Sequence, residues 1–180
     1  LEKNWDDQGV RITEGYGWYR IHVVIHSVLK NGTSGQVLLD LGPIDDADET
    51  WFNGQFVGKT GSMPPDPDGY SSQWSTPRRY IVDAGKVSWD KDNVIAVRVY
   101  NGGDPGGFFD RAVRIGKPEL SDLVQMTMTG EKNNCRLVLK STVKTTGALD
   151  VTISEPVEGE ISGILEEKAP DLKKVSLDRK

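Results

Sequence analysis

The sequence has few of the residues on which several classes of protein depend. Its 180 residues include one cysteine, Cys135, so no disulfide can form within the chain. Cys135 lies in an alternating apolar run, which indicates a buried thiol rather than a nucleophile. No hydrophobic run approaches the roughly 20 residues that a membrane-spanning helix needs, so no membrane span is expected.

Basic charge is also scarce. The chain has 22 Lys and Arg against 27 Asp and Glu, which gives a net charge of −5, and the basic side chains are not clustered. Because phosphate backbones are bound by clustered Lys and Arg, nucleic acid is not an expected partner.

Patterns that would carry catalysis are missing too. His22 and His26 have the i, i+4 spacing of a helical zinc pair, but they fall on an expected strand. There they would lie roughly 13 Å apart, too far to share one metal ion. No G-x-S-x-G motif is present to place a serine nucleophile. The sequence therefore predicts no catalytic constellation in this chain.

The abundant residues point to β-structure. The chain holds 20 Gly, 9 Pro and 5 Trp, and its turn-forming residues separate short apolar runs. Residues 18–28 alternate in polarity, which predicts a strand, and Gln36–Leu41 is apolar on both faces, as a central strand would be. Asn53-Gly54 predicts a type I′ hairpin. The other strands expected before residue 118 are 49–52, 55–59, 79–82 and 94–100.

Two loops are rich in glycine and proline. Gly61–Pro77 carries four prolines, a density that neither a helix nor a central strand tolerates, and it displays Tyr70 and Trp74. Asn101–Gly107 is the second loop, and Phe108 and Phe109 follow it. Long loops in compact domains are often functional, so these loops are the first place to look for a site.

The amino-acid composition changes after Pro118. Residues 118–180 contain no Trp or Tyr, and strands are expected at 124–129, 135–143 and 149–153 before a charged end. We predict a β-sandwich over 1–117, while 118–180 holds either its closing strands or the start of a second β-module, plus a charged tail. The chain begins at Leu1 without a methionine or a signal peptide, so we expect a processed or excised piece of a longer protein.

Several segments, taken in order, resemble a known family. They are GWYR at 17–20, LGPIDDADETWFNGQFVG at 41–58, RRY at 78–80, NVIAVRVY at 93–100 and the glycine pair at 106–107. This pattern, over roughly residues 5–117, resembles the sugar-binding jelly-roll domain at the N-terminus of glycoside hydrolase family 2 enzymes. It is also similar to the accessory domain of sialate O-acetylesterase-like proteins.

The resemblance implies an all-β, galactose-binding-like jelly-roll β-sandwich with additional C-terminal β-strands. It implies a non-catalytic accessory module beside a catalytic domain, in a secreted, periplasmic or cell-surface enzyme of bacterial type. Trp18 and Trp51 are then expected to fill the space between the sheets. The family pattern also places Arg20, Arg79 and Arg98 on strands near the aspartates of the DDAD segment, where a buried Arg–Asp pair would be structural.

Asp45, Asp46 and Asp48 allow three interpretations. They are structural by the family pattern, and the barrel that carries that family's catalytic acids is absent from this chain. As paired carboxylates they would suit glycoside hydrolysis. As hard oxygen ligands they would suit a calcium ion, for which the loop residues Asp66, Asp68 and Asp104 are further candidates, although no EF-hand spacing is present.

A carbohydrate site is the positive hypothesis for the loops. Aromatic rings stack on the C–H face of a sugar, and polar side chains bond its hydroxyls. The residues predicted to bind sugar are Tyr70, Trp74 and Phe108 as platforms, with Asp68, Arg78, Asn101 and Asp104 as hydroxyl partners. The alternative is that Tyr70 and Trp74 pin the long loop to the sandwich or dock it on a neighbouring domain.

Three functions remain open from the sequence. The first is an accessory module of a carbohydrate-active enzyme, with carbohydrate and the catalytic domain of a longer chain as partners. The second is an extracytoplasmic ligand-sensing or protein-interaction domain without glycan binding. The third is a free-standing lectin-like protein.

Overall fold

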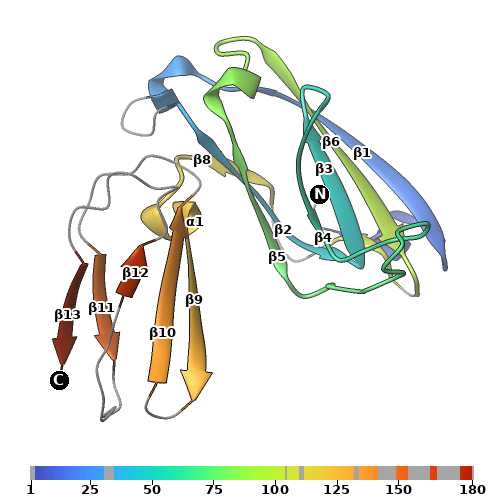
Figure 1. Ribbon diagram of the computed structural model, residues 1–180. Coiled ribbons are helices and arrows are strands. Elements are labelled where there is room, and N and C mark those ends of the chain that lie inside the picture. The colour runs from blue at the N-terminus through green and yellow to red at the C-terminus, as the bar shows by residue number, and fades with distance from the viewer. Residues whose placement is uncertain are drawn as a thin grey trace. The chain divides into compact units, whose positions relative to one another are not determined.

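The computed structural model describes residues 3–30, 35–103, 105–109, 112–131, 134–141, 149–153, 163–165 and 175–179. Asp104, the side chain of Cys135 and the charged segments 166–168 and 173–174 lie outside what is described. The chain divides into two compact units, Leu1–Pro118 and Glu119–Lys180 (Figure 1). Within the described residues, no helix is long and apolar enough to cross a membrane.

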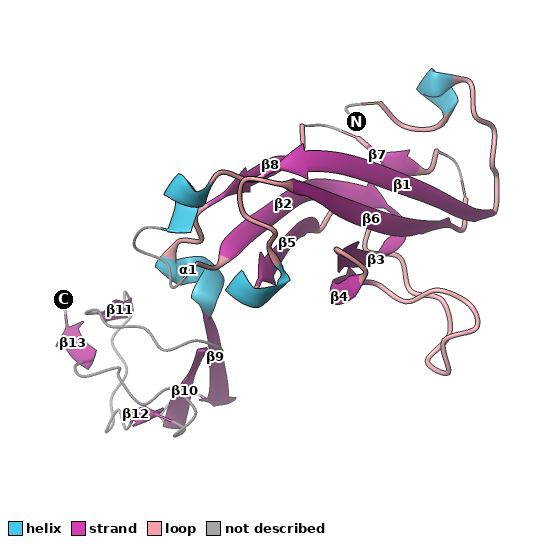
Figure 2. Cartoon of the chain, turned by 90° about the horizontal axis from the view of Figure 1, so that it is seen from above, coloured by secondary structure: helices cyan, strands magenta, loops and turns pink. Residues whose placement is uncertain are grey.

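The first unit is built from two antiparallel sheets. One sheet has the strand order β1-β6-β3-β4, and the other has β5-β2-β7, with β8 also paired to β2 (Figures 1 and 2). The strands are β1 (Gly15–Val24), β2 (Val37–Asp45), β3 (Ala47–Phe52), β4 (Gln55–Thr60), β5 (Pro77–Val82), β6 (Asp92–Asn101), β7 (Gly107–Phe108) and β8 (Arg114–Gly116), with 3₁₀ turns η1 (Asp6–Gln8), η2 (Ser27–Lys30) and η3 (Ala84–Lys86). The predicted β-sandwich is confirmed, and its jelly-roll connectivity stays a prediction.

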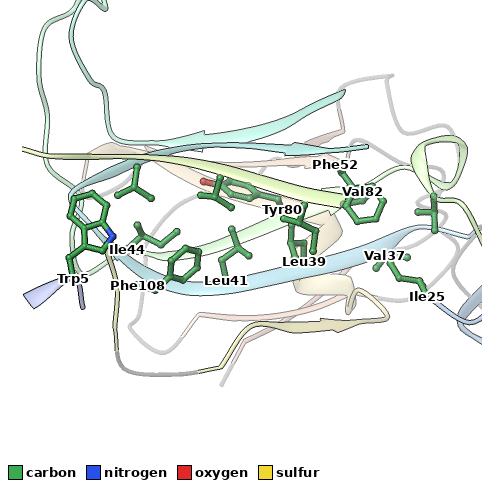
Figure 3. Close-up of a cluster of buried hydrophobic side chains, with 14 residues drawn as sticks. Trp5, Ile25, Val37, Leu39, Leu41, Ile44, Phe52, Tyr80, Val82 and Phe108 are labelled. Atoms are coloured by element: carbon green, nitrogen blue, oxygen red, sulfur yellow. The ribbon is translucent and has the colours of Figure 1, made fainter. Parts of the chain in front are cut away.

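The core lies between these sheets. Residue burial along β2 is continuous from Val37 to Ile44, as expected for a central strand with both flanks paired. Strand β6 instead alternates, so that Ile95, Val97 and Val99 are buried. Figure 3 shows the buried side chains that gather here, among them Trp5, Ile25, Leu39, Leu41, Phe52, Tyr80 and Phe108.

The hairpin predicted at Asn53-Gly54 is confirmed. It joins β3 to β4, and both residues have positive φ, 48° and 77°. Asn53 also ties the turn to η3 and β6: its Nδ2 donates to the Lys86 carbonyl, and its Oδ1 accepts from the Val94 amide, both at 2.9 Å. Its side chain therefore does more than permit the turn.

Trp18 and Trp51 do not fill the space between the sheets, contrary to prediction. The alternation of β1 turns Trp18 outward, with 49% of it exposed, and its ring stacks on that of Trp51 with centroids 5.5 Å apart. The interior position is taken by Trp5, which packs over Gly17, where a Cβ would overlap the indole. A tryptophan far from the strand in sequence thus fills the place expected for one within it.

The second unit consists of a four-residue helix and short strands. They are α1 (Leu120–Leu123), β9 (Val124–Glu131), β10 (Asn134–Ser141), β11 (Leu149–Ile153), β12 (Gly163–Leu165) and β13 (Val175–Arg179). The sheets are β12-β10-β9 and β11-β13. Among the described strands, those after Pro118 pair only with one another. The interpretation of 118–180 as closing strands or as the start of a second β-module stays a prediction.

Candidate functional site

A cleft of about 410 Å³ opens on the first unit. It is lined by Asn4, Asp45, Asp46, Trp74, Pro105 and Phe109. Its walls come from the end of β2, the long loop before β5, the loop after β6 and the residue that follows β7. A volume of this size accommodates a small ligand, and the lining combines aromatic rings with carboxylates.

The floor of the cleft lies where the chain passes from one sheet to the other. Asp45 ends β2, which lies in the β5-β2-β7 sheet. Strand β3 of the β1-β6-β3-β4 sheet begins only two residues later. The backbone of Asp46 is held on both sides, because its amide donates to the Tyr100 carbonyl and its carbonyl accepts from the Gln73 amide, each at 3.0 Å. The two carboxyl groups are therefore carried on a fixed backbone.

Asp46 is surrounded by hydrogen-bond donors. Its carboxylate accepts from the Ser72 hydroxyl at 2.5 Å and from the Gly102 amide at 2.8 Å. Burial by itself would raise the pKa of Asp46, but hydrogen bonds with Asp45, Ser72, Gly102 and Tyr70 outweigh burial and lower that pKa. Asp46 is consequently the ionised member of the pair.

Asp45 is the member that titrates. Burial, followed by the hydrogen bond and the negative charge of Asp46, raises the pKa of Asp45 to about 7, although the charge of Arg78 opposes this. Near neutral pH the pair therefore carries between one and two negative charges. The two carboxyl groups are hydrogen-bonded to each other, whereas glycoside hydrolysis needs them about 5 Å or more apart with the sugar between them.

Trp74 and Phe109 form the aromatic wall. The Trp74 side chain is 56% exposed, and its ring stacks on that of Phe109 with centroids 6.2 Å apart and an interplanar angle of 28°. The loop around Trp74 is tied down, because Nη1 of Arg78 donates to the carbonyls of Gln73 at 2.7 Å and Thr76 at 2.5 Å. An exposed tryptophan on a fixed loop is a suitable platform for a ligand.

Tyr70 anchors the loop instead of presenting a face to the cleft. Its ring packs edge-on against Tyr100, 5.4 Å between centroids, and closely over Gly102. Burial and the neighbouring Asp46 raise the pKa of Tyr70 to about 12. Met63 is buried beside Tyr100 and fastens the same loop. Tyr70 therefore makes the contacts that the loop-pinning alternative predicts, whereas Trp74 lines the cleft.

Arg78 has a structural role. Its Nε donates to Asp48 at 2.8 Å, and both side chains are fully buried. Asp48 also accepts from Thr50 and Tyr80, each at 2.9 Å. The expected buried Arg–Asp pair is thus present, but through Arg78 and not through the three arginines named from the sequence. Of those, Arg20 lies over Trp18, Arg79 pairs with Asp40, and Arg98 pairs with Glu49.

Three residues predicted to bind sugar are buried, and we remove them from the site. Arg78, Asn101 and Phe108 have no exposed surface. The Asn101 amide group donates to the Ile12 carbonyl at 2.8 Å, and Phe108 packs edge-on against Tyr19. For Arg78 and Asn101 the reason is local, because the alternation of β5 and β6 turns their side chains inward. Phe108 lies on β7, whose two residues are both buried.

Neither of the two predicted aspartates, Asp68 and Asp104, is found among the described lining residues. Asp68 lies on the long loop, where its amide donates to Asp66, and it does not line the cleft. Asp104 is not described. Sequence reasoning missed Asn4, Pro105 and Phe109. For Phe109 a signal existed, because adjacent residues of an extended segment point to opposite sides, so one of Phe108 and Phe109 had to face outward.

The three DDAD aspartates do not make a calcium site. Asp48 faces the interior, where Arg78, Thr50 and Tyr80 occupy its oxygens. Asp66, another candidate, pairs with Lys59 at 2.9 Å. Within the part of the chain that the structure describes, no group of three metal-binding side chains is found.

Comparison with protein-family models and with curated proteins found no match. Solved structures are similar at low identity. A glycoside hydrolase family 2 member from Bacteroides cellulosilyticus is 19% identical, with a TM-score of 0.49, over 71% of this chain and 18% of that one. A β-glucuronidase from Bacteroides uniformis is 19% identical, with a TM-score of 0.45, over 67% and 15%. A β-glucuronidase from Ruminococcus gnavus is 13% identical, with a TM-score of 0.47, over 72% of this chain and 25% of that one.

This chain therefore spans a quarter or less of the length of these enzymes. The structure from Bacteroides cellulosilyticus is described as a member of glycoside hydrolase family 2, the family that the sequence motifs of this chain resemble.

Proposed function

We propose that this chain is a non-catalytic carbohydrate-binding accessory module, and that a glycan binds in the cleft against Trp74. The observation that carries the proposal is the exposed Trp74 ring, stacked on Phe109, at the edge of a cleft whose floor is the Asp45–Asp46 pair. A sugar ring would stack its C–H face on the indole and donate hydroxyl protons to the carboxylates.

The proposed parent is a secreted, periplasmic or cell-surface carbohydrate-active enzyme. This part rests on the sequence resemblance of the segment 41–58, which includes the Asp45–Asp46 floor and the Asn53-Gly54 hairpin. The module would hold or flank substrate while a neighbouring domain of the longer chain performs the chemistry.

A glycan-array screen of the full chain, followed by calorimetry on each hit, tests the proposal. Trp74→Ala is expected to lower affinity by about 5- to 150-fold, if a sugar gains from stacking on an aromatic ring the roughly 1–3 kcal/mol that a nucleic-acid base gains. Trp18→Ala is the matched control, because it removes a similarly exposed tryptophan from the outward face of β1. Binding lost with Trp18→Ala and kept in Trp74→Ala would place the site elsewhere.

A second function is favoured by that outer face. Tyr16, Trp18 and Phe56 are each more than 40% exposed there, and Arg20 and Arg98 lie over the rings of Trp18 and Tyr16. Aromatic and arginine side chains are enriched where proteins bind one another. Should no glycan bind the folded chain, this protein-interaction function replaces the first.

A further inference from the structure

The lining residues that the structure describes give the cleft a negative charge. Among the described lining residues, Asp45 and Asp46 are acidic and the other four are uncharged. Among the described residues, the guanidinium whose charge acts on Asp45 is that of Arg78, which is fully buried. It is occupied by Asp48 at Nε, by the Asp46 carbonyl at Nη2, and by two loop carbonyls at Nη1, so it cannot turn toward a ligand.

We infer that the cleft binds uncharged sugars and rejects their uronic acid counterparts. The inference rests on the proposed function, because it concerns the ligand of the same cleft. A uronate places a carboxylate on the sugar ring, and a ring stacked on Trp74 brings that group close to two carboxylates that no cation in the described lining offsets. Carboxylates that lie close together in a partly desolvated site repel each other strongly.

The strength with which the cleft disfavours uronates is expected to depend on pH. At pH 8 both carboxyl groups are ionised, and at pH 5 Asp45 holds a proton that it donates to Asp46, which leaves one negative charge. Among the described residues, the other ionisable groups that act on the pair are Arg78 from β5, Tyr70 from the long loop and Tyr100 from β6. Arginine is charged throughout this range, and the pKa of each tyrosine is raised, so none of the three changes charge between pH 5 and 8. The change in selectivity over this range therefore belongs to Asp45.

Matched glycans measure the selectivity. The full chain is titrated with gluco-, galacto- and manno-oligosaccharides and with the corresponding oligouronates, at low salt and with a chelator present. For whichever sugar binds, the uncharged form is expected to bind at least tenfold more tightly than the uronate at pH 8. The ratio of the two affinities is expected to fall severalfold at pH 5, and to fall in 0.5 M salt because the repulsion is screened.

Two charge-removing substitutions give the decisive comparison. Asp45→Asn keeps a donor to Asp46 and removes one charge, so it is expected to lower the affinity ratio at pH 8 toward its pH 5 value. Asp68→Asn removes the same charge from a residue outside the cleft lining and is expected to leave the ratio unchanged. Equal affinity for a sugar and its uronate at pH 8, or a ratio unaffected by Asp45→Asn, would overturn the inference.

Failure of the proposed function looks different. In that case neither member of any pair binds, or the affinities of both persist in Trp74→Ala. A glycan that needs Trp74 but binds equally well as its uronate would leave the proposed function standing and remove only the charge selectivity.

Discussion

Asp45 and Asp46 are chain neighbours whose carboxyl groups have opposite pKa shifts. Asp46 receives hydrogen bonds from Ser72 and Gly102, whereas Asp45 is partly buried and has the hydrogen bond and the charge of Asp46 beside it. The pKa of Asp45 rises from 3.8 to about 7, so the folded chain holds a proton that the unfolded chain has lost between those values. Its contribution therefore makes the fold less stable as pH rises through this window.

Asp45→Asn is expected to remove this pH dependence. Because the substituted amide still donates to Asp46 but carries no charge, the free energy of unfolding at pH 8 should increase by about 1–2 kcal/mol, after discounting for the partial exposure of the group. At pH 5 the change should be small. Urea denaturation followed by tryptophan fluorescence measures both values, and an equal change at the two pH values would contradict the assignment.

The buried Arg78–Asp48 pair is expected to respond strongly to loss of one partner. Arg78→Met leaves the Asp48 carboxylate buried without its cation and frees two loop carbonyls, so we expect a loss of about 3–5 kcal/mol in stability. Lys59→Met breaks the solvent-screened pair with Asp66 and should change stability far less than Arg78→Met does. Similar costs for both substitutions, measured by urea denaturation, would show that burial does not set the strength of these pairs.

Strand β1 shows how one glycine sets the packing of an element. Gly17 lies on its inward face, and the Trp5 indole occupies the space that a side chain there would need. The Trp5 backbone is fixed by donation of its amide to the Gly106 carbonyl at 2.9 Å, and the ring also packs on Gly106 and Gly107. Trp5 thereby anchors the N-terminal segment to the core, while the residues around it stay at the surface.

Gly17→Ala is expected to displace Trp5 and to destabilise the sandwich by about 1–3 kcal/mol, the usual cost of overpacking. Gly85→Ala is the control, because a Cβ at that position meets no atom within 4 Å and its φ is not positive. Thermal unfolding followed by near-ultraviolet circular dichroism should show a lower midpoint for Gly17→Ala alone. An unchanged midpoint would mean that Trp5 moves without cost.

At the scale of the whole molecule, the described strands of each unit pair only within that unit. No described ladder of backbone hydrogen bonds runs from one unit to the other. A substitution in the sandwich is therefore expected to loosen its own strands first.

Hydrogen exchange measured by mass spectrometry tests this separation. In Gly17→Ala, the amides of β2 and β6 should exchange faster than in the unsubstituted chain, while those of β9 and β10 should keep their rates. Faster exchange in both units together would show that they open as one cooperative body.

The sequence by itself determined the all-β class, the central strand and the Asn53-Gly54 hairpin, because period-two polarity and turn chemistry are local properties. The alternation of residues 18–28 already placed Trp18 on the same face as Arg20, so its outward orientation was also within reach of the sequence. The family pattern did not reveal this orientation, because it places a tryptophan on the strand without saying which face of the strand carries it. The pattern also does not show that Trp5 covers the inward face.

The candidate site was decided by tertiary structure. The cleft joins Asn4, Asp45, Trp74 and Phe109, which are far apart in the chain, and β2 brings two of them together by pairing with β7. The shared proton of Asp45 and Asp46 follows from burial and from donors on two loops, Ser72 and Gly102. Burial and long-range hydrogen bonds depend on how the chain closes on itself, and no local pattern of residues encodes them.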